Sequence, residues 1–403
     1  MPDSLEIISS ISSIVDSVYE PVEFPALNML MQEWKCTVPF AGLRVLVGTP
    51  IFRNTMLEYK ALLLGGADLS VGRAVADEGG SSMPCDSKIV DFLKNAGVGV
   101  LTPQEVLALE AEGEYFDLIL DCAGQFSACH PRYGFVELTR SGVHFFENVE
   151  VPVFVADSGI VKRIETSLGT GEGYIRGLRQ LGFSDFEGKK FAVFGSGKVG
   201  SGIVLQLLRE GACVQVVTDT SFGVNGFLLA NNVSVLDCKN VSAVSALVLE
   251  SDFVVTATGV KNALDVPEIT TALLKSKAIL ANMGVEDEYG AGVPAERVLS
   301  AKAPLNFILE EPTHLKYIDA SLALHAALGE RLMQEVMGII DADDDFIDCK
   351  NSEKVANCES LAIKKSTLRN PPVDLEQRIL MVSIQNGVIG PEINEMLGYA
   401  PEE

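Results

Sequence analysis

Three glycines are spaced as in a phosphate-binding turn, in the run Gly195-Ser196-Gly197-Lys198-Val199-Gly200. The run directly follows the apolar stretch 190–194 and opens a helical pattern over residues 199–211. In such a turn the first glycine permits a tight bend, the second lets the backbone approach a pyrophosphate, and the third allows close contact between helix and strand. The helix N-terminus offers N–H groups and a positive dipole end to the phosphates. The spacing therefore predicts a dinucleotide-binding site.

An acidic residue, Asp219, ends the next apolar stretch, residues 213–218. A carboxylate at this place accepts hydrogen bonds from the hydroxyls of the adenosine ribose. It would also repel a 2′-phosphate, so the sequence predicts NAD rather than NADP. Two later strand ends, at Thr258-Gly259 and at Asn282, fall at the carboxyl edge where open α/β sheets bind ligands, and we add them to the predicted cofactor contacts. The alternative is a glycine-rich turn that binds nothing.

The elements that must position these residues form two series of apolar strands alternating with helical patterns. The first series runs from Leu43 to Asp121, and the second runs from Lys189 through residues 305–311. Fully apolar strands separated by amphipathic helices are typical of parallel sheets with both faces covered. Residues 156–188 are predicted as a helix and linker between the series. We also expect an amphipathic helix within residues 1–19, helix from 315 to 337, and a last helix over 375–390 that is apolar enough to contact a core or a second subunit.

Composition limits the classes of partner. The chain of 403 residues has 55 Asp and Glu against 31 Lys and Arg, a formal charge of −24, which disfavours nucleic acid and anionic membrane surfaces. Eight cysteines and four histidines show neither zinc-ligand spacing nor a disulfide framework. With no apolar run of about 18 residues, we expect a cytoplasmic protein with reduced thiols. The acidic run Asp341–Asp348 is interpreted as a solvated surface, because the spacing of a calcium loop is absent.

Five segments resemble the adenosylhomocysteinase family, over roughly residues 40–335: residues 116–126, 141–158, 191–212, 252–259 and 278–284. The resemblance implies an α/β protein in which an NAD-binding Rossmann domain (184–315) is inserted in a split flavodoxin-like substrate domain (1–165), with a helical return and oligomer contacts over 320–403. It implies permanently held NAD, redox chemistry on a small-molecule substrate and a homo-oligomer. It adds Thr139 to the cofactor contacts.

The chain departs from the family at the positions of the catalytic acids, bases and substrate contacts. There it has Cys122, Gln125, Leu138, Arg163, Glu165, Thr166, Thr170 and Val285. An arginine cannot act as the tunable base that a buried lysine can be, so authentic adenosylhomocysteine hydrolysis is not expected. Two interpretations stay open. One is an NAD(H)-dependent enzyme that transfers hydride on a small polar substrate in an interdomain cleft; the other is a catalytically silent NAD-binding regulatory homologue.

Three residues are candidates for catalysis: Arg163, Glu165 and His314. A guanidinium can hold a substrate carboxylate or phosphate with two hydrogen bonds, and a nearby carboxylate can exchange a proton, although an ion pair on a linker explains Arg163 and Glu165 equally well. His314 is similarly placed to the general-acid histidine of D-2-hydroxyacid dehydrogenases, and a capping or surface role is its alternative. Cys122 is interpreted as a small buried residue, and His325 as a core histidine with its ring nitrogens paired.

Overall fold

A computed structural model describes residues 4–73, 84–224, 226–340 and 367–398. The chain divides into two compact units. Unit 1 comprises Met1–Lys162 and Asp319–Val388, and unit 2 comprises Arg163–Ile318 and Ile389–Glu403. The predicted acidic surface at Asp341–Asp348 lies outside the described residues.

Unit 1 is built on a parallel sheet of seven strands in the order β12-β6-β5-β4-β1-β2-β3. The strands are β1 (Arg44–Val47), β2 (Asp68–Gly72), β3 (Gly99–Leu101), β4 (Leu118–Asp121), β5 (Gly134–Glu137), β6 (Val153–Val155) and β12 (Leu368–Arg369). In the register, Val45 of β1 lies opposite both Leu69 of β2 and Leu118 of β4. The strand order reverses between β1 and β4, so the carboxyl ends of these two strands form the switch point of the sheet.

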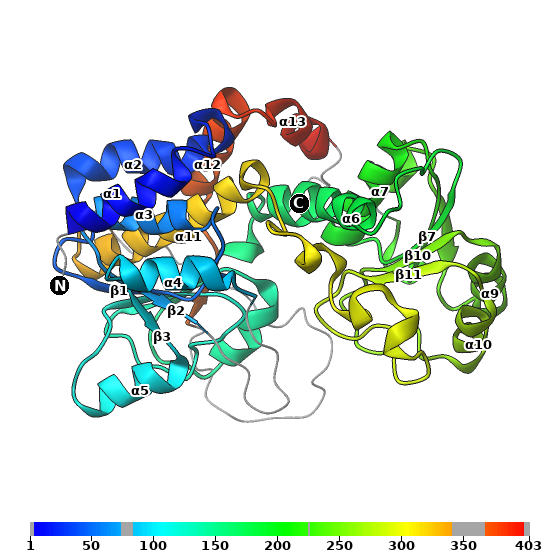
Figure 1. Cartoon of the computed structure of the whole chain (residues 1–403), viewed down its shortest axis with the longest axis horizontal. Helices are drawn as coiled ribbons and strands as arrows, with labels where there is room; N and C mark the ends of the chain where they lie inside the picture. The colour runs from blue at the N-terminus through cyan, green and yellow to red at the C-terminus, as the bar shows by residue number, and fades with distance from the viewer. Residues whose placement is uncertain (1–3, 74–83, 225, 341–366, 399–403) are drawn as a thin grey trace. The chain divides into compact units, whose positions relative to one another are not determined.

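Helices cover this sheet, and Figure 1 shows α1, α2, α3, α11 and α12 gathered on one side of it. The helices are α1 (Ser4–Val15), α2 (Pro25–Thr37), α3 (Met56–Leu64), α4 (Ser87–Asn95), α5 (Pro103–Ala111), α11 (Leu315–Val336) and α12 (Val373–Asn386), with short η1 (Pro21–Glu23), η2 (Arg140–Phe146) and η3 (Ala156–Ser158). The amphipathic N-terminal helix is confirmed: α1 buries Ile7, Ile11 and Val15, which are four residues apart and so share one face.

Unit 2 contains a parallel sheet of five strands in the order β11-β10-β7-β8-β9. Its elements are η4 (Ile164–Gly169), α6 (Thr170–Gln180), β7 (Lys190–Phe194), α7 (Lys198–Arg209), β8 (Cys213–Thr218), η5 (Thr220–Phe222), α8 (Gly226–Ala230), β9 (Ser234–Asp237), α9 (Val241–Glu250), β10 (Phe253–Thr256), α10 (Pro267–Lys275), β11 (Ile279–Asn282) and α13 (Gly390–Gly398). Figure 1 shows α6 and α7 on one side of the sheet and α9 and α10 on the other. The predicted α/β fold with a Rossmann domain is confirmed.

One predicted strand is wrong: residues 305–311 do not extend the sheet. Three short 3-10 helices follow β11 instead, η6 (Ala295–Arg297), η7 (Leu299–Lys302) and η8 (Leu305–Ile308). Beyond β11 there are only isolated bridges, from Leu280 to Val298 and from Asn282 to Pro304. Pro304 has no N–H to donate to a ladder. Leu305 then turns away to lie close to Gly177 of α6. Its apolar side chain is therefore buried against a helix, not within a sheet.

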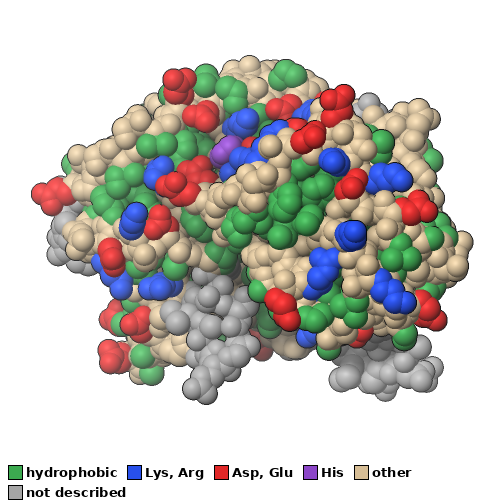
Figure 2. Space-filling view, turned by 45° about the vertical axis from the view of Figure 1, so that its right-hand side comes forward, with side chains coloured by type: hydrophobic (Ala, Val, Ile, Leu, Met, Phe, Trp, Pro, Cys, Tyr) green, Lys and Arg blue, Asp and Glu red, His purple; other side chains and the backbone are tan. Residues whose placement is uncertain are grey.

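Acidic and basic side chains are interspersed on the face of the molecule shown in Figure 2. The net negative charge is therefore not gathered into one patch on that face. Within the described ranges, no helix combines the length and the apolar character needed to cross a bilayer.

Candidate functional site

The glycine turn after β7 has the geometry that its sequence predicts. Gly195 has φ +109°, and a Cβ there would lie 2.3 Å from the carbonyl oxygen of Ala257. A Cβ at Gly200 would lie 2.1 Å from the carbonyl oxygen of Gly195. A Cβ on Gly197, the N-cap residue of α7, would meet no protein atom within 4 Å. Gly195 and Gly200 thus allow the backbone to close tightly, while Gly197 leaves open space in front of the helix.

The first turn of α7 faces this space. Lys198 and Val199 begin the helix and are partly exposed. N–H groups in the first turn of a helix have no partner within the helix and can bind an anion. The Ser196 hydroxyl lies 2.9 Å from the Thr218 hydroxyl, and Ser201 Oγ donates to the Ser196 carbonyl oxygen at 3.0 Å. The turn is therefore fixed to the end of β8 and fits a pyrophosphate.

Asp219 lies directly after β8, where the adenosine ribose is expected. One of its oxygens, Oδ1, accepts hydrogen bonds from Ser221 N at 3.0 Å, from Ser221 Oγ at 2.5 Å and from Lys239 Nζ at 3.0 Å. The bonds from Ser221, with help from Lys239, lower the pKa of Asp219 to about 2. The carboxylate is therefore ionised at neutral pH and acts as an acceptor for hydroxyl groups.

The loop after β10 has its backbone donors already in use. Glu288 is buried and accepts hydrogen bonds of 2.8 Å from Thr258 N, Thr258 Oγ1 and Gly259 N. Burial raises the pKa of Glu288 above its ordinary value, although these bonds oppose the rise. Sequence analysis missed Glu288, which stands next to two other acidic residues and has no distinguishing spacing. The N–H groups of Thr258 and Gly259 serve the fold here.

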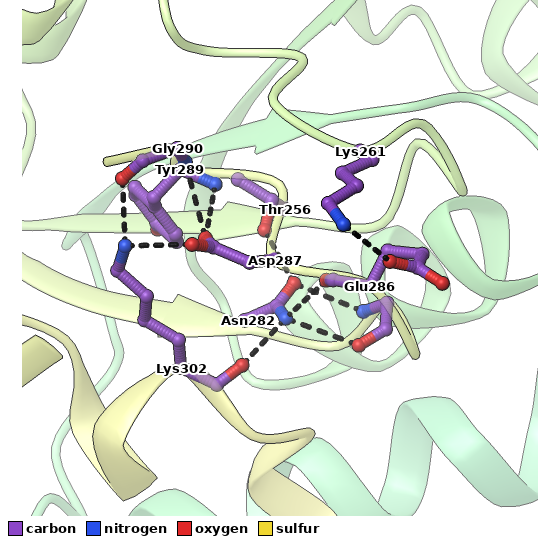
Figure 3. A network of polar contacts seen from close by, with 9 residues as sticks. Thr256, Lys261, Asn282, Glu286, Asp287, Tyr289, Gly290 and Lys302 are labelled. Atoms are coloured by element: carbon purple, nitrogen blue, oxygen red, sulfur yellow. Dashed lines mark hydrogen bonds and ion pairs between the residues drawn. The ribbon is translucent and has the colours of Figure 1, made fainter. Parts of the chain in front are cut away.

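Asn282, at the end of β11, is also fully engaged by the protein, as Figure 3 shows. Its Oδ1 accepts from Thr256 Oγ1 at 2.8 Å and from Gly284 N at 3.1 Å. Its Nδ2 donates to the carbonyl oxygens of Gly284, Glu286 and Lys302 at 3.0, 2.9 and 2.7 Å. An amide with five such contacts holds the loops after β10 and β11 together. The structure thus gives the Asn282 side chain a positioning role.

A lysine closes the same loop from the other side in Figure 3. Lys302 Nζ donates to Asp287 Oδ2 at 2.8 Å and to the Gly290 carbonyl oxygen at 2.7 Å. Partial burial would raise the pKa of Asp287, but the bond from Lys302 and two backbone N–H groups hold it below its ordinary value. These contacts fix the loop that follows β11, so the carboxyl edge beside the glycine turn has a defined shape.

The predicted catalytic residues all belong to unit 2 but lie on different elements. Arg163 immediately precedes the π-helix η4, and Glu165 lies within it. His314 precedes α11, and its Nδ1 lies 3.2 Å from Glu172 Oε1 of α6. Partial burial would raise the pKa of Glu172, but hydrogen bonds from His314 and Arg176 keep it below its ordinary value. No motif or spacing indicated Glu172, which orients the His314 ring through Nδ1.

Close backbone contacts join η4 and α6 to α7. A Cβ on Gly171 of α6 would lie 2.4 Å from the carbonyl oxygen of Gly202 in α7. A Cβ on Gly202 would lie 1.9 Å from the carbonyl oxygen of Ser167 in η4. Neither glycine can therefore carry a side chain without moving a helix. The segment that carries Glu165 is thereby held against the helix that begins at the glycine turn.

The remaining predicted cofactor contact, Thr139, lies in unit 1, after β5. Thr139 N and Oγ1 both donate to Glu137 Oε1 at 2.6 Å, and Ala123 N donates to Thr139 Oγ1 at 3.1 Å. Ala123 N and Gly124 N also donate to the two oxygens of Glu137 at 2.9 Å. The Glu137 carboxylate is therefore held within the protein by the loop after β4, and the Thr139 hydroxyl takes part in this network.

At two positions where the resemblance places functional carboxylates, the structure has buried apolar groups. Cys122 is 5% exposed and Leu138 is 3% exposed. The neighbouring Asp121 is also buried, and its pKa is raised by burial and by the nearby Glu137. The interpretation of Cys122 as a small buried residue is confirmed. Around Cys122 and Leu138 the structure therefore presents no acid or base to a ligand.

His325 is confirmed as a core histidine with paired ring nitrogens. Its Nδ1 lies 2.8 Å from Glu58 Oε1, and both side chains are 0% exposed. Its Nε2 lies 3.1 Å from the carbonyl oxygens of Asp121 and Val136. Since carbonyl oxygens only accept, Nε2 carries a hydrogen. The ring thus joins α11 to α3 and to the ends of β4 and β5.

Comparison with known proteins agrees with this geometry. Residues 167–291 match the family described as "S-adenosyl-L-homocysteine hydrolase, NAD binding domain". The match covers the glycine turn, Asp219 and Asn282, and it confirms NAD as the cofactor. Asp219 and the open space at Gly197 fit that cofactor at its adenosine and pyrophosphate parts.

Curated relatives are distant. An adenosylhomocysteinase of Sulfurisphaera tokodaii is 26% identical over 288 residues, which is 65% of this chain and 65% of the relative. An adenosylhomocysteinase of Thermoplasma acidophilum is 22% identical over 348 residues, 78% of this chain and 80% of the relative. The chain thus spans just under two thirds of the length of the first of these relatives.

Solved structures with a related backbone include a dipicolinate synthase from Bacillus halodurans, at 16% identity and a TM-score of 0.48, covering 73% of this chain and 99% of that chain. A transhydrogenase from Sinorhizobium meliloti is 14% identical with a TM-score of 0.42, covering 72% of this chain and 95% of that chain.

Proposed function

Because this chain is a divergent member of the adenosylhomocysteinase-like superfamily, we propose that it is an NAD(H)-dependent enzyme that transfers hydride to and from a small polar substrate. We propose further that it does not hydrolyse adenosylhomocysteine. The observation that carries the first statement is the intact glycine turn, with open space at Gly197 and an ionised Asp219 at the next strand end. The second rests on the buried apolar side chains of Cys122 and Leu138.

In the proposed reaction each group of the chain has a stated task. The turn from Gly195 to Gly200 holds the pyrophosphate, and Asp219 accepts the ribose hydroxyls. When bound, NAD supplies an acceptor and donor of hydride. Arg163 holds an anionic group of the substrate, and Glu165 exchanges the proton that accompanies hydride transfer.

His314 is the second candidate for that proton. Its Nδ1 faces Glu172, so the other ring nitrogen, Nε2, is the one that would exchange a proton with substrate. Substitution of His314 by Gln and of Glu165 by Gln in separate variants distinguishes the two. The variant that loses turnover while keeping NAD affinity identifies the proton carrier.

The experiment that tests the enzyme proposal follows the absorbance of the reduced nicotinamide while the full chain meets a panel of small hydroxy and keto metabolites. We expect at least one to change the redox state of the bound nucleotide. A thiol-release assay with adenosylhomocysteine should give no signal above the rate without protein. Release at the rate of a curated adenosylhomocysteinase assayed beside it would contradict the second part of the proposal.

A silent NAD-binding regulatory protein is the second candidate. Two observations favour it: the donors of Thr258, Gly259 and Asn282 are committed to the protein, and so is the hydroxyl of Thr139. If bound nucleotide keeps its redox state with every metabolite of the panel, this candidate replaces the enzyme.

We also propose that the chain forms a homo-oligomer through its C-terminal helices. In support, α12 buries Ile379 but exposes Val373 and Met381. Apolar side chains of this kind are enriched where a second protein surface covers them. Light scattering on the full chain tests this, and a monomer at micromolar concentration would contradict it.

A further inference from the structure

We propose that Lys239 sets how strongly the nucleotide site rejects a phosphate on the adenosine 2′-hydroxyl, so that the chain prefers NAD over NADP only moderately. The proposal concerns binding alone and holds whether the chain is an enzyme or a silent NAD-binding protein. It modifies the expectation, drawn from Asp219 alone, that a carboxylate simply repels the 2′-phosphate.

The observation is an ammonium group placed on the ribose-binding carboxylate. Lys239 Nζ lies 3.0 Å from Asp219 Oδ1 and 3.2 Å from Ser221 Oγ. The side chain of Lys239 is 64% exposed and that of Asp219 is 33% exposed. Both groups can therefore reach a ligand from the solvent side. A site with an acid alone would carry one negative charge here, whereas this pair is formally neutral.

The fold brings Lys239 to this place. β8 and β9 are neighbouring parallel strands, and Thr218 lies opposite Asp237 in their register. Lys239 follows the end of β9 by two residues, and its backbone N donates to Asp237 Oδ1 at 2.8 Å. Thr220 donates its hydroxyl to the other oxygen of Asp237. The backbone of Lys239 is thus fixed at the carboxyl edge, beside Asp219, while its long side chain remains adjustable.

The charges decide between the two nucleotides as follows. With NAD, Asp219 accepts the ribose hydroxyls and Lys239 stays beside the carboxylate. With NADP, the 2′-phosphate approaches Asp219 and is repelled, but the ammonium group can turn from the carboxylate to the phosphate. An exposed ion pair is weak and costs little to exchange, and a lysine–phosphate hydrogen bond is charge-assisted. Lys239 therefore offsets part of the repulsion that Asp219 imposes.

Calorimetry with NAD and NADP on the full chain, freed of bound nucleotide, tests this. We expect the natural protein to bind NAD only ~10-fold more tightly than NADP, since the attraction to one charge opposes the repulsion from the other. Lys239→Met should widen this preference by a further ~10-fold, almost entirely by weakening NADP. Asp219→Ser should invert the preference, because the lysine remains and the repulsion is gone.

Lys275→Met is the matched control. Lys275 is an exposed lysine of the same unit, in the last turn of α10, which leads to the start of β11 and so to the opposite edge of the sheet. It removes one positive charge without touching the site, and it should leave both affinities unchanged. Thermal unfolding of each variant checks that unit 2 still folds.

Three results would overturn the proposal. One is an unchanged ratio of NAD to NADP affinity in the folded Lys239→Met variant. Another is an equal loss of affinity for both nucleotides in that variant. The third is an Asp219→Ser variant that binds NADP no better than NAD.

Discussion

The buried pair of His325 and Glu58 gives the sharpest test of how unit 1 is held together. His325→Ala removes a ring that bridges α11, α3 and the ends of β4 and β5. It leaves a cavity, two carbonyl oxygens without this donor, and a fully buried Glu58 without its partner. Removing one partner of a buried pair costs ~3 to 5 kcal/mol, since the remaining group stays desolvated.

Glu58→Gln should be much milder. Within the described residues Glu58 Oε2 has no hydrogen-bond partner, which disfavours a full negative charge there. A glutamine amide can donate to His325 Nδ1 as a protonated carboxyl would, while Nε2 keeps its two carbonyl partners. We therefore expect a loss of ~1 kcal/mol or less, the size of one neutral hydrogen bond.

Denaturant unfolding measured by tryptophan fluorescence reads unit 1 directly. Trp34 is the one tryptophan of the chain and is 1% exposed in α2. His130→Ala serves as the control, because His130 is an exposed histidine that also contacts a carboxylate, Glu110. It should shift the free energy of unfolding by less than ~1 kcal/mol. Equal losses in the His325→Ala and Glu58→Gln variants would refute the reasoning.

Gly197→Ala should leave the unfolding temperature unchanged but weaken NAD binding by ~1 to 3 kcal/mol in calorimetry, because its Cβ enters open space in front of α7; Gly200→Ala should instead lower the unfolding temperature, because its Cβ meets backbone at 2.1 Å. Burial raises the pKa of Asp319 to about 7, despite two backbone N–H groups that bond to it. Its protonated form therefore stabilises the fold below the unfolded pKa of about 4, and this contribution is lost as pH rises to about 7, so the natural protein should lose stability relative to Asp319→Asn over that range in pH-dependent unfolding. With an identified substrate, Arg163→Lys should lower kcat/KM by ~1.5 to 3 kcal/mol and Glu165→Gln should lower kcat, both with unchanged NAD affinity; full turnover in both variants would remove these residues from the proposed mechanism.

Features encoded locally were predictable from the sequence. The glycine turn, the strand before it and the acid after β8 lie within 30 residues of one another, and each depends on backbone geometry that few residues permit. The apolar run at residues 305–311 shows the limit of this reasoning. Its composition suits a strand, but Pro304 cannot join a ladder and Leu305 finds its partner on α6.

Partners of polar side chains were not predictable, because they depend on tertiary structure. Glu288 bonds to Thr258 from 30 residues away, and Glu58 bonds to His325 from 267 residues away. Lys239 reaches Asp219 because β8 and β9 are neighbours in the sheet. The sequence allowed the type of each residue to be judged, as with the core histidine, but not the group beside it.

The glycine contacts between η4, α6 and α7 have a mechanical consequence. Side chains absorb small displacements by changing rotamer, whereas backbone that touches backbone transmits them. At Gly171 and Gly202 no side chain intervenes, so a shift of α7 is passed to Ser167 and along η4 to Glu165. The helix whose first turn meets the pyrophosphate and the π-helix that carries Glu165 therefore move as one rigid element. Nucleotide loading and the placement of that carboxylate are thus a single conformational variable.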